Sequence, residues 1–180
     1  MSRGLPRTFY AEIASLARSK KIKMILDTSG IPLLKAAKKG VYLLKPNLAE
    51  LCTLVGKDSL STMDVDNAAK EVLQNEFCEI LIVSLAARGA LLATKKELSY
   101  IMAPPVHLRS AVGAGDSMVA GIVLGLEAGK SLHDTVRYAV ACGTAATMTE
   151  GTQLCRKRDV NRLYRWLQQL AKAKTNAYKM

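Results

Sequence analysis

A glycine-rich segment followed by an aspartate offers the clearest candidate chemistry in the sequence. In VGAGD, Gly113 and Gly115 can adopt backbone angles closed to other residues and let a ligand approach the main chain. Asp116 stands where a long apolar helix is expected to begin, and the N–H groups of a helix start attract negative charge. A carboxylate there could take the proton of a hydroxyl during phosphoryl transfer. On spacing alone an equal alternative remains, in which Asp116 is a helix N-cap and the glycines allow tight packing.

The segment KPNLAE is the second candidate. Asn47, followed three residues later by Glu50, has the form of a capping box, which by itself requires no function. The pair also stands at the expected carboxyl end of a strand, where open α/β sheets bind their ligands. There Glu50 could order water around magnesium and Lys45 could lie near a phosphate. On these residues alone, the capping box is the favoured interpretation.

Two further segments contain small residues at points where elements meet. In SLAARGALL, Ser84 ends a predicted strand and Gly89 turns the chain into the next one. A tight turn is the default explanation, and a loop lining a nucleotide is the alternative. In ACGTAATMTEGTQL, Gly143 and the small residues 144–147 let a helix lie close to another helix or to an adenine ring.

The elements that must position these residues alternate between amphipathic helices and short apolar strands. We expect strands in KMILDTSG, VYLLKPN and EILIVSL, and an antiparallel pair in ALLAT and LSYIMA. We expect helices at 8–20, 32–38, 47–56, 63–74, 116–128, 132–149 and 158–174. Strands alternating with helices predict an α/β fold with a mainly parallel sheet flanked by helices. Since no repeat, linker or composition shift marks a boundary, we expect one domain over residues 1–180.

The basic charge of the chain is concentrated at its two ends. The net charge is +11, of which residues 1–25 contribute +5 and residues 155–180 contribute +7, while residues 26–154 carry −1. A solvated terminal helix explains this pattern better than a polyanion-binding surface does, so nucleic acid is not an expected partner. The four cysteines form no CxxC pair and the chain has two histidines, so no zinc site is expected.

Composition points to an ordinary globular chain, with 49% apolar, 23% charged and 5% aromatic residues. The start of the chain has no signal-peptide pattern, and no apolar run reaches the roughly 18 residues of a membrane-spanning helix. The expected location is therefore a reducing cytoplasm.

Taken together and in this order, the segments resemble the PfkB family of carbohydrate kinases, which have the ribokinase fold. GAGDSMVAG resembles the family's C-terminal signature, KPNLAEL its N-x-x-E element, and VSLAARGAL its nucleotide loop. VRYAVACGTAATMTEGTQLC resembles the type II 6-phosphofructokinases, with 1-phosphofructokinase and tagatose-6-phosphate kinase as near neighbours. The resemblance implies ATP-dependent phosphorylation of a sugar-phosphate hydroxyl, fructose 6-phosphate to fructose 1,6-bisphosphate in glycolysis.

The resemblance also assigns roles by position. It makes Asp116 the catalytic base and gives the N–H groups around Gly113, Ala114 and Gly115 the anion hole for the moving phosphoryl group. It assigns Mg²⁺ and its waters to Asn47 and Glu50. The residues that it places at ATP are Lys45, Asn47, Ser84, Gly89 and Thr144, and those that it places at K⁺ are Ser110, Thr149 and Gly151.

Three departures from the family pattern accompany the resemblance. Ala86 stands where the family usually has glycine, Ala111 replaces a usual Thr or Ser, and Gly4 replaces a serine that contacts the sugar phosphate in relatives. The opening SRGLP corresponds to a segment that normally lies far inside the family's chain. The resemblance therefore implies the C-terminal, nucleotide-binding part of the fold, without the first strands, the sugar-binding segment and the lid through which phosphofructokinases dimerise. For this part alone we expect little or no turnover, and the alternative function is that of an inactive nucleotide-binding fragment.

Overall fold

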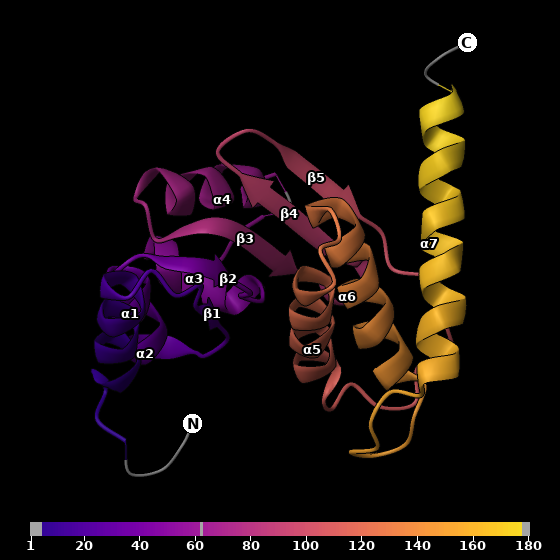
Figure 1. The fold of residues 1–180 in the computed structure, drawn as a ribbon, viewed down its shortest axis with the longest axis horizontal. Helices are drawn as coiled ribbons and strands as arrows, with labels where there is room; N and C mark the ends of the chain where they lie inside the picture. The colour runs from indigo at the N-terminus through magenta and orange to yellow at the C-terminus, as the bar shows by residue number, and fades with distance from the viewer. Residues whose placement is uncertain (1–4, 62, 178–180) are drawn as a thin grey trace. The chain divides into compact units, whose positions relative to one another are not determined.

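The computed structural model describes residues 5–61 and 63–177 (Figure 1). The predicted sugar-contact position, Gly4, lies outside these residues. Contacts between Cα atoms divide the chain into two compact units, Met1–Ala86 with Leu91–Tyr100, and Ala87–Ala90 with Ile101–Met180. We call them unit 1 and unit 2.

A five-stranded sheet runs through the strands in chain order, β1 to β5. Strands β1 (Ile25–Leu26), β2 (Val41–Leu44) and β3 (Cys78–Ser84) are parallel. Strands β4 (Ala90–Thr94) and β5 (Leu98–Ile101) follow after connections too short for a parallel crossover, so they add antiparallel strands. The sheet is therefore mixed, and the predicted antiparallel pair forms a hairpin closed by a bond from Thr94 N to the Glu97 carbonyl (2.9 Å).

The helices of unit 1 pack on the sheet through one shared apolar core. They are α1 (Phe9–Ser19), α2 (Gly30–Ala37), α3 (Leu48–Val55) and α4 (Val65–Gln74). Successive right-handed crossovers place their helices on the same face of a parallel sheet. The core accordingly joins helix residues such as Leu33, Leu51 and Val72 to Leu44 and Leu81 of the strands.

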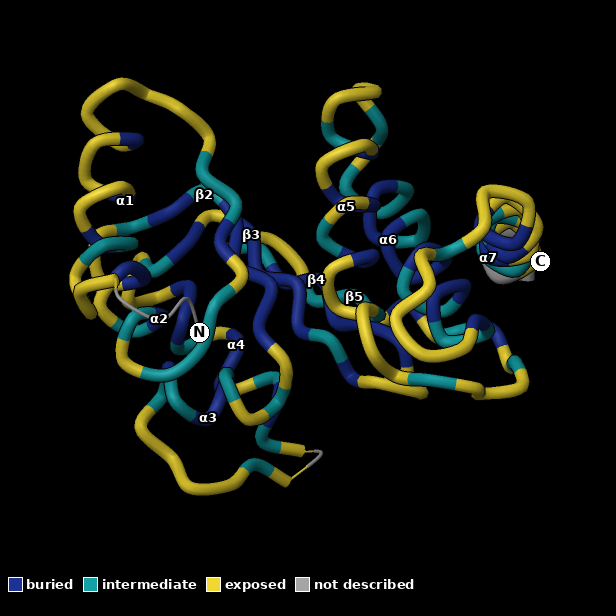
Figure 2. The backbone as a smooth tube through the Cα atoms, turned by 90° about the horizontal axis from the view of Figure 1, so that it is seen from below, coloured by how far each residue is buried: buried dark blue, intermediate teal, exposed yellow. Residues whose placement is uncertain are grey.

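Most residues of the central strands are buried, and Figure 2 draws them in dark blue. Leu44 and Leu81 belong to the shared core, and the residues that alternate with them, Leu43, Ile80 and Ile82, are also at most 5% exposed. Burial on both faces explains why these strands are continuous apolar runs rather than alternating ones.

Unit 2 consists mainly of three helices, α5 (Ala114–Glu127), α6 (Leu132–Thr147) and α7 (Lys157–Ala177). Helices α5 and α6 approach closely because α5 presents glycines to its neighbour. A Cβ atom added at Gly121 would lie 2.7 Å from Ala139 Cα, and one added at Gly125 would lie 3.0 Å from Thr135 Cα. Helix α5 begins at residue 114 rather than at the predicted 116. Helix α6 ends at 147 rather than 149, and α7 ends at 177 rather than 174.

Helix α7 is attached to the rest of unit 2 by one apolar side and by an aromatic contact. Val160, Leu163 and Leu167 are buried. The Tyr138 and Tyr164 rings meet edge to face at 5.2 Å, and Lys130 Nζ lies 5.2 Å from the Tyr164 ring centre. Among the described residues, no helix has both the length and the apolar character needed to cross a bilayer.

Candidate functional site

The glycine-rich segment forms the start of α5, in unit 2. Gly113 is the N-cap and adopts a left-handed conformation (φ +76°, ψ −1°) that favours glycine. Asp116 is the third residue of the helix and is exposed. The expectation that Asp116 itself could be the N-cap is therefore wrong. The first N–H groups of a helix lack intrahelical acceptors, so this start is suited to negative charge.

The loop before α5 is attached to the end of α6. The N–H groups of Arg109 and Ser110 both donate to the Thr147 carbonyl, at 2.8 and 3.3 Å. Ser110 Oγ donates to the Gly151 carbonyl at 2.9 Å and accepts from Val112 N at 3.2 Å. These bonds hold the segment that leads into Gly113.

Helix α6 also approaches the start of α5 directly. A Cβ atom added at Gly143 would lie 3.2 Å from the Ala114 carbonyl oxygen, so Gly143 and its neighbour Thr144 lie beside the glycine-rich segment. The structure thus brings the α6 segment around Gly143 and Thr144 to the start of α5, which joins two of the four sequence motifs, while the role of Thr144 stays a prediction.

Gly89 is required by the backbone around it. Its φ is +97°, and an added Cβ atom would lie 2.0 Å from the Ile101 carbonyl oxygen and 2.6 Å from Ala103 N. No side chain fits there, which supports the tight-turn explanation for this glycine.

In unit 1, Asn47 and Glu50 form the predicted capping box at the start of α3. Asn47 Oδ1 accepts from Glu50 N at 2.9 Å, and Glu50 Oε2 accepts from Asn47 N at 2.8 Å. An ionised carboxylate has about four acceptor sites, so this bond leaves Glu50 able to accept from water as well. Among the described residues no group of three or more His, Cys, Asp or Glu could hold a metal ion. The free acceptor sites of Glu50 and the amide oxygen of Asn47 are of the oxygen type that Mg²⁺ binds through its waters.

Three of the predicted residues meet where the parallel strands end. Asn47 and Ser84 form a parallel bridge, and Ser84 N donates to the Pro46 carbonyl at 2.8 Å. Lys45 follows β2, and its side chain is 4% exposed. The Lys45 ammonium lies 3.4 Å from Asp27 Oδ1, which provides the counter-ion that a buried charge needs.

Asp27 is the residue at this edge that sequence reasoning assigned no role. The signal was present, because Asp27 directly follows the first predicted strand. Carboxyl ends of neighbouring parallel strands meet at one edge of a sheet, so a polar residue after β1 belongs with those after β2 and β3.

Ala86, noted as a departure from the family pattern, has a left-handed backbone with φ +52°. Such a conformation costs a residue with a Cβ atom about 1–2 kcal/mol, a cost that glycine avoids. The structure therefore gives a physical reason for the glycine that the family usually has at this position.

The three residues considered for potassium lie close together in unit 2. Ser110 Oγ is bonded to the Gly151 carbonyl, and Thr149 Oγ1 lies 2.8 Å from the carbonyl oxygens of both Ala146 and Gln153. The group is rich in carbonyl and hydroxyl oxygens, which hard cations prefer.

Comparison with known proteins gives a match over most of the chain. The model of the pfkB family carbohydrate kinases matches residues 1–159. The ATP-dependent 6-phosphofructokinase isozyme 2 of Escherichia coli K12 is 38% identical over 157 residues, 87% of this chain and 51% of that protein. The 1-phosphofructokinase of Borreliella burgdorferi is 35% identical over 155 residues, 86% of this chain and 49% of that protein. The chain thus spans about half the length of these relatives.

Solved structures agree with the sequence comparison. Phosphofructokinase-2 from Escherichia coli in complex with potassium has a TM-score of 0.87 and 37% identity, covering 92% of this chain and 54% of that one. The ribokinase of Arabidopsis thaliana, at 22% identity, has a TM-score of 0.77 and supports the shared fold alone.

Proposed function

The chain belongs to the pfkB family of carbohydrate kinases and has its ribokinase-like fold, and on that premise we propose that it is the nucleotide-binding part of an ATP-dependent sugar-phosphate kinase. In this proposal residues 1–180 are one incomplete kinase domain, and the substrate is fructose 6-phosphate, phosphorylated to fructose 1,6-bisphosphate. The name of the 38% identical relative, a 6-phosphofructokinase, supports this substrate.

The observation that carries the proposal is the start of α5. Gly113 contributes only backbone there, so no N-cap side chain takes up the first-turn N–H groups, and the bond from Ala114 N to the Ala111 carbonyl is long at 3.4 Å. In our proposal the N–H groups of Gly113, Ala114 and Gly115 stabilise the charge that develops on the transferred phosphoryl group. Asp116, exposed in the same turn, accepts the proton of the attacking sugar hydroxyl.

We assign the polar edge of unit 1 to the nucleotide and its metal ion. Glu50 and Asn47 hold the waters of Mg²⁺, and Lys45 supplies positive charge near the phosphates. Bound Mg²⁺ neutralises charge on the phosphates during transfer. The remaining residues proposed to line the nucleotide are Ser84, Gly89 and Thr144.

We also propose a potassium site at Ser110, Thr149 and Gly151. The oxygen-rich grouping of these residues supports it, and a 37% identical relative was solved in complex with potassium. Such a site would hold the loop before Gly113 through the bond that Ser110 makes.

A second candidate substrate is fructose 1-phosphate. It is favoured by the 35% identity to a 1-phosphofructokinase, and the two substrates are separated by assaying each with ATP. Turnover with fructose 1-phosphate alone would replace the leading substrate by this one.

Calorimetry with Mg-ATP tests the nucleotide site independently of turnover. We expect the chain to bind Mg-ATP, because the α5 start suits phosphate and the oxygens of Asn47 and Glu50 suit hydrated Mg²⁺. Undetectable binding would contradict the proposal, including its alternative of an inactive nucleotide-binding fragment.

A coupled assay with ATP and fructose 6-phosphate tests the role of Asp116. In Asp116→Asn we expect any turnover to fall by about 10²–10⁴, with Mg-ATP affinity retained, because a general base acts on the hydroxyl and not on the nucleotide. Glu127→Gln, at the other end of α5, is the matched control and should keep its turnover. Full turnover in Asp116→Asn would show that another group takes the proton.

A further inference from the structure

Helix α7 carries a line of exposed cations on one side. Arg158, Arg162, Arg165 and Lys172 are spaced by four, three and seven residues and are all exposed. At 100° per residue these positions fall within an arc of about 80°, and they extend over about 21 Å of helix. We call these four residues the basic stripe.

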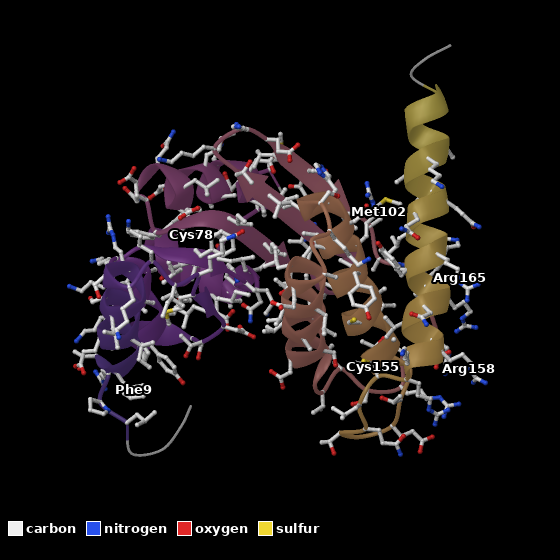
Figure 3. All side chains as sticks on the ribbon, in the orientation of Figure 1. Phe9, Cys78, Met102, Cys155, Arg158 and Arg165 are labelled. Atoms are coloured by element: carbon white, nitrogen blue, oxygen red, sulfur yellow. The ribbon has the colours of Figure 1, made fainter. Side chains whose placement is uncertain are left out.

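The opposite side of α7 is already occupied. Val160, Leu163 and Leu167 are at most 6% exposed, and Figure 3 shows Arg158 and Arg165 directed away from α6. A helix that inserts into a membrane surface needs a free apolar face, and this one is packed. Apart from Trp166, which is 38% exposed, what α7 offers to a partner along this side is charge.

The charge of the basic stripe is poorly balanced within its own helix. From Cys155 to Met180 the sequence has one acidic residue, Asp159, which is 9% exposed and lies 3.3 Å from Arg162. Arg165 Nε donates to the Asn161 carbonyl at 3.2 Å, a neutral partner that leaves the charge in place. Three net positive charges therefore line this side of α7.

The kinase site gives no reason for this charge. The family match ends at residue 159, so nearly all of the basic stripe lies beyond it. The residues proposed to bind ATP and the sugar phosphate all lie before Glu150.

We propose that the basic stripe binds the phosphodiester backbone of nucleic acid, without reading the bases. A guanidinium matches the geometry of a phosphate with paired donors, and three of the four residues are arginines. The length of about 21 Å corresponds to about six base pairs of a duplex, whose phosphates present a dense row of negative charge. The charge pattern in the sequence favoured a solvated helix. The structure adds that the cations share one side and that the apolar side is unavailable.

Fluorescence anisotropy with a labelled DNA duplex of about 20 base pairs tests the proposal. Three phosphate contacts predict a slope of about −2.7 for log affinity against log salt, or a loss of about 40-fold from 50 to 200 mM salt. In the triple variant Arg158→Gln, Arg165→Gln, Lys172→Gln the slope should fall to near zero, with at least about a tenfold loss of affinity at the lower salt. Arg162 is left in place because it pairs with Asp159.

The control is the triple variant Lys20→Gln, Lys35→Gln, Lys38→Gln. It removes the same three positive charges, but from exposed residues of unit 1. It should keep the affinity and the slope, and circular dichroism should show that both variants remain folded. Equal losses in the two variants would assign binding to net charge and overturn the proposal, as would a flat salt response of the wild type. If the triple variant loses binding to phosphatidylglycerol vesicles but binds the duplex as the wild type does, the result overturns the proposal in favour of a membrane surface. The outcome does not depend on whether the chain is a kinase.

Discussion

Helices α3 and α5 both begin beside residues that we place in the kinase site, but their first turns are completed in opposite ways. At α3, the side chains of Asn47 and Glu50 accept from the backbone N–H groups of the helix start. At α5, the N-cap is Gly113, which has no side chain to offer. At α3 two donors of the helix start are therefore taken up by side chains, whereas at α5 no N-cap side chain competes with a ligand and Ala114 N makes only a long bond of 3.4 Å to the Ala111 carbonyl.

The bodies of the two helices differ as well. Helix α3 buries Leu51 and Leu54 in the core of unit 1. Helix α5 buries Gly121 and Gly125, and so brings its backbone close to α6. The two helices are thus positioned by different contacts, α3 by leucine side chains and α5 by the approach of its backbone to α6.

The largest effect on stability is expected where that backbone contact is broken. Gly121→Val places side-chain atoms where Ala139 Cα lies only 2.7 Å from the new Cβ atom. We expect a loss of at least about 3 kcal/mol in the free energy of unfolding, the upper end for an overpacked site. Urea unfolding measures it, and Ala120→Val, on the exposed side of α5, is the control for the valine itself. Equal losses in both variants would show that the contact does not matter.

An intermediate effect is expected at the glycine start. Gly113→Ala meets no atom within 4 Å, so its cost of about 1–2 kcal/mol comes from the left-handed backbone alone. Gly129→Ala, with φ +65° and the same open surroundings just after α5, should cost a similar amount. Only Gly113→Ala should weaken Mg-ATP binding in calorimetry. If both variants bind Mg-ATP equally well, the α5 start is not the anion site.

The smallest effect is expected at the self-capped start. Asn47→Ala removes the side chain that accepts from Glu50 N and should cost about 1 kcal/mol. Thermal or urea unfolding measures this loss, and Asn67→Ala, exposed within α4, should lose nothing comparable. An unchanged stability of Asn47→Ala would mean that water replaces the cap.

The features that the sequence predicted are those set by local pattern. Apolar runs located the strands, and the spacing of Asn47 and Glu50 located a capping box that the structure confirms. The start of α5 was misplaced because it depends on the left-handed conformation of Gly113, and glycine is compatible with both signs of φ.

Tertiary proximity accounts for the features that local pattern did not predict. Asp27 and Lys45 are separated by a whole crossover, so their pairing follows only once β1 and β2 are known to be neighbours. The close approach of Gly121 to Ala139 likewise depends on how α5 and α6 cross. The roles assigned to Asp116, Lys45 and Thr144 in catalysis and nucleotide binding stay predictions.

The Asp27–Lys45 ion pair also links the end of β1, the first strand in the sheet order, to the end of β2. Strand β1 is only two residues long and pairs on one side, with β2, so its own backbone bonds hold it weakly. If β1 separated from β2, Lys45, whose side chain is 4% exposed, would lose the carboxylate 3.4 Å away. A buried charge left without its partner is costly, so fraying of this edge is opposed by electrostatics where hydrogen bonds are few. The pairing of β1 with β2 is thus stabilised at the carboxyl ends of the two strands by this ion pair.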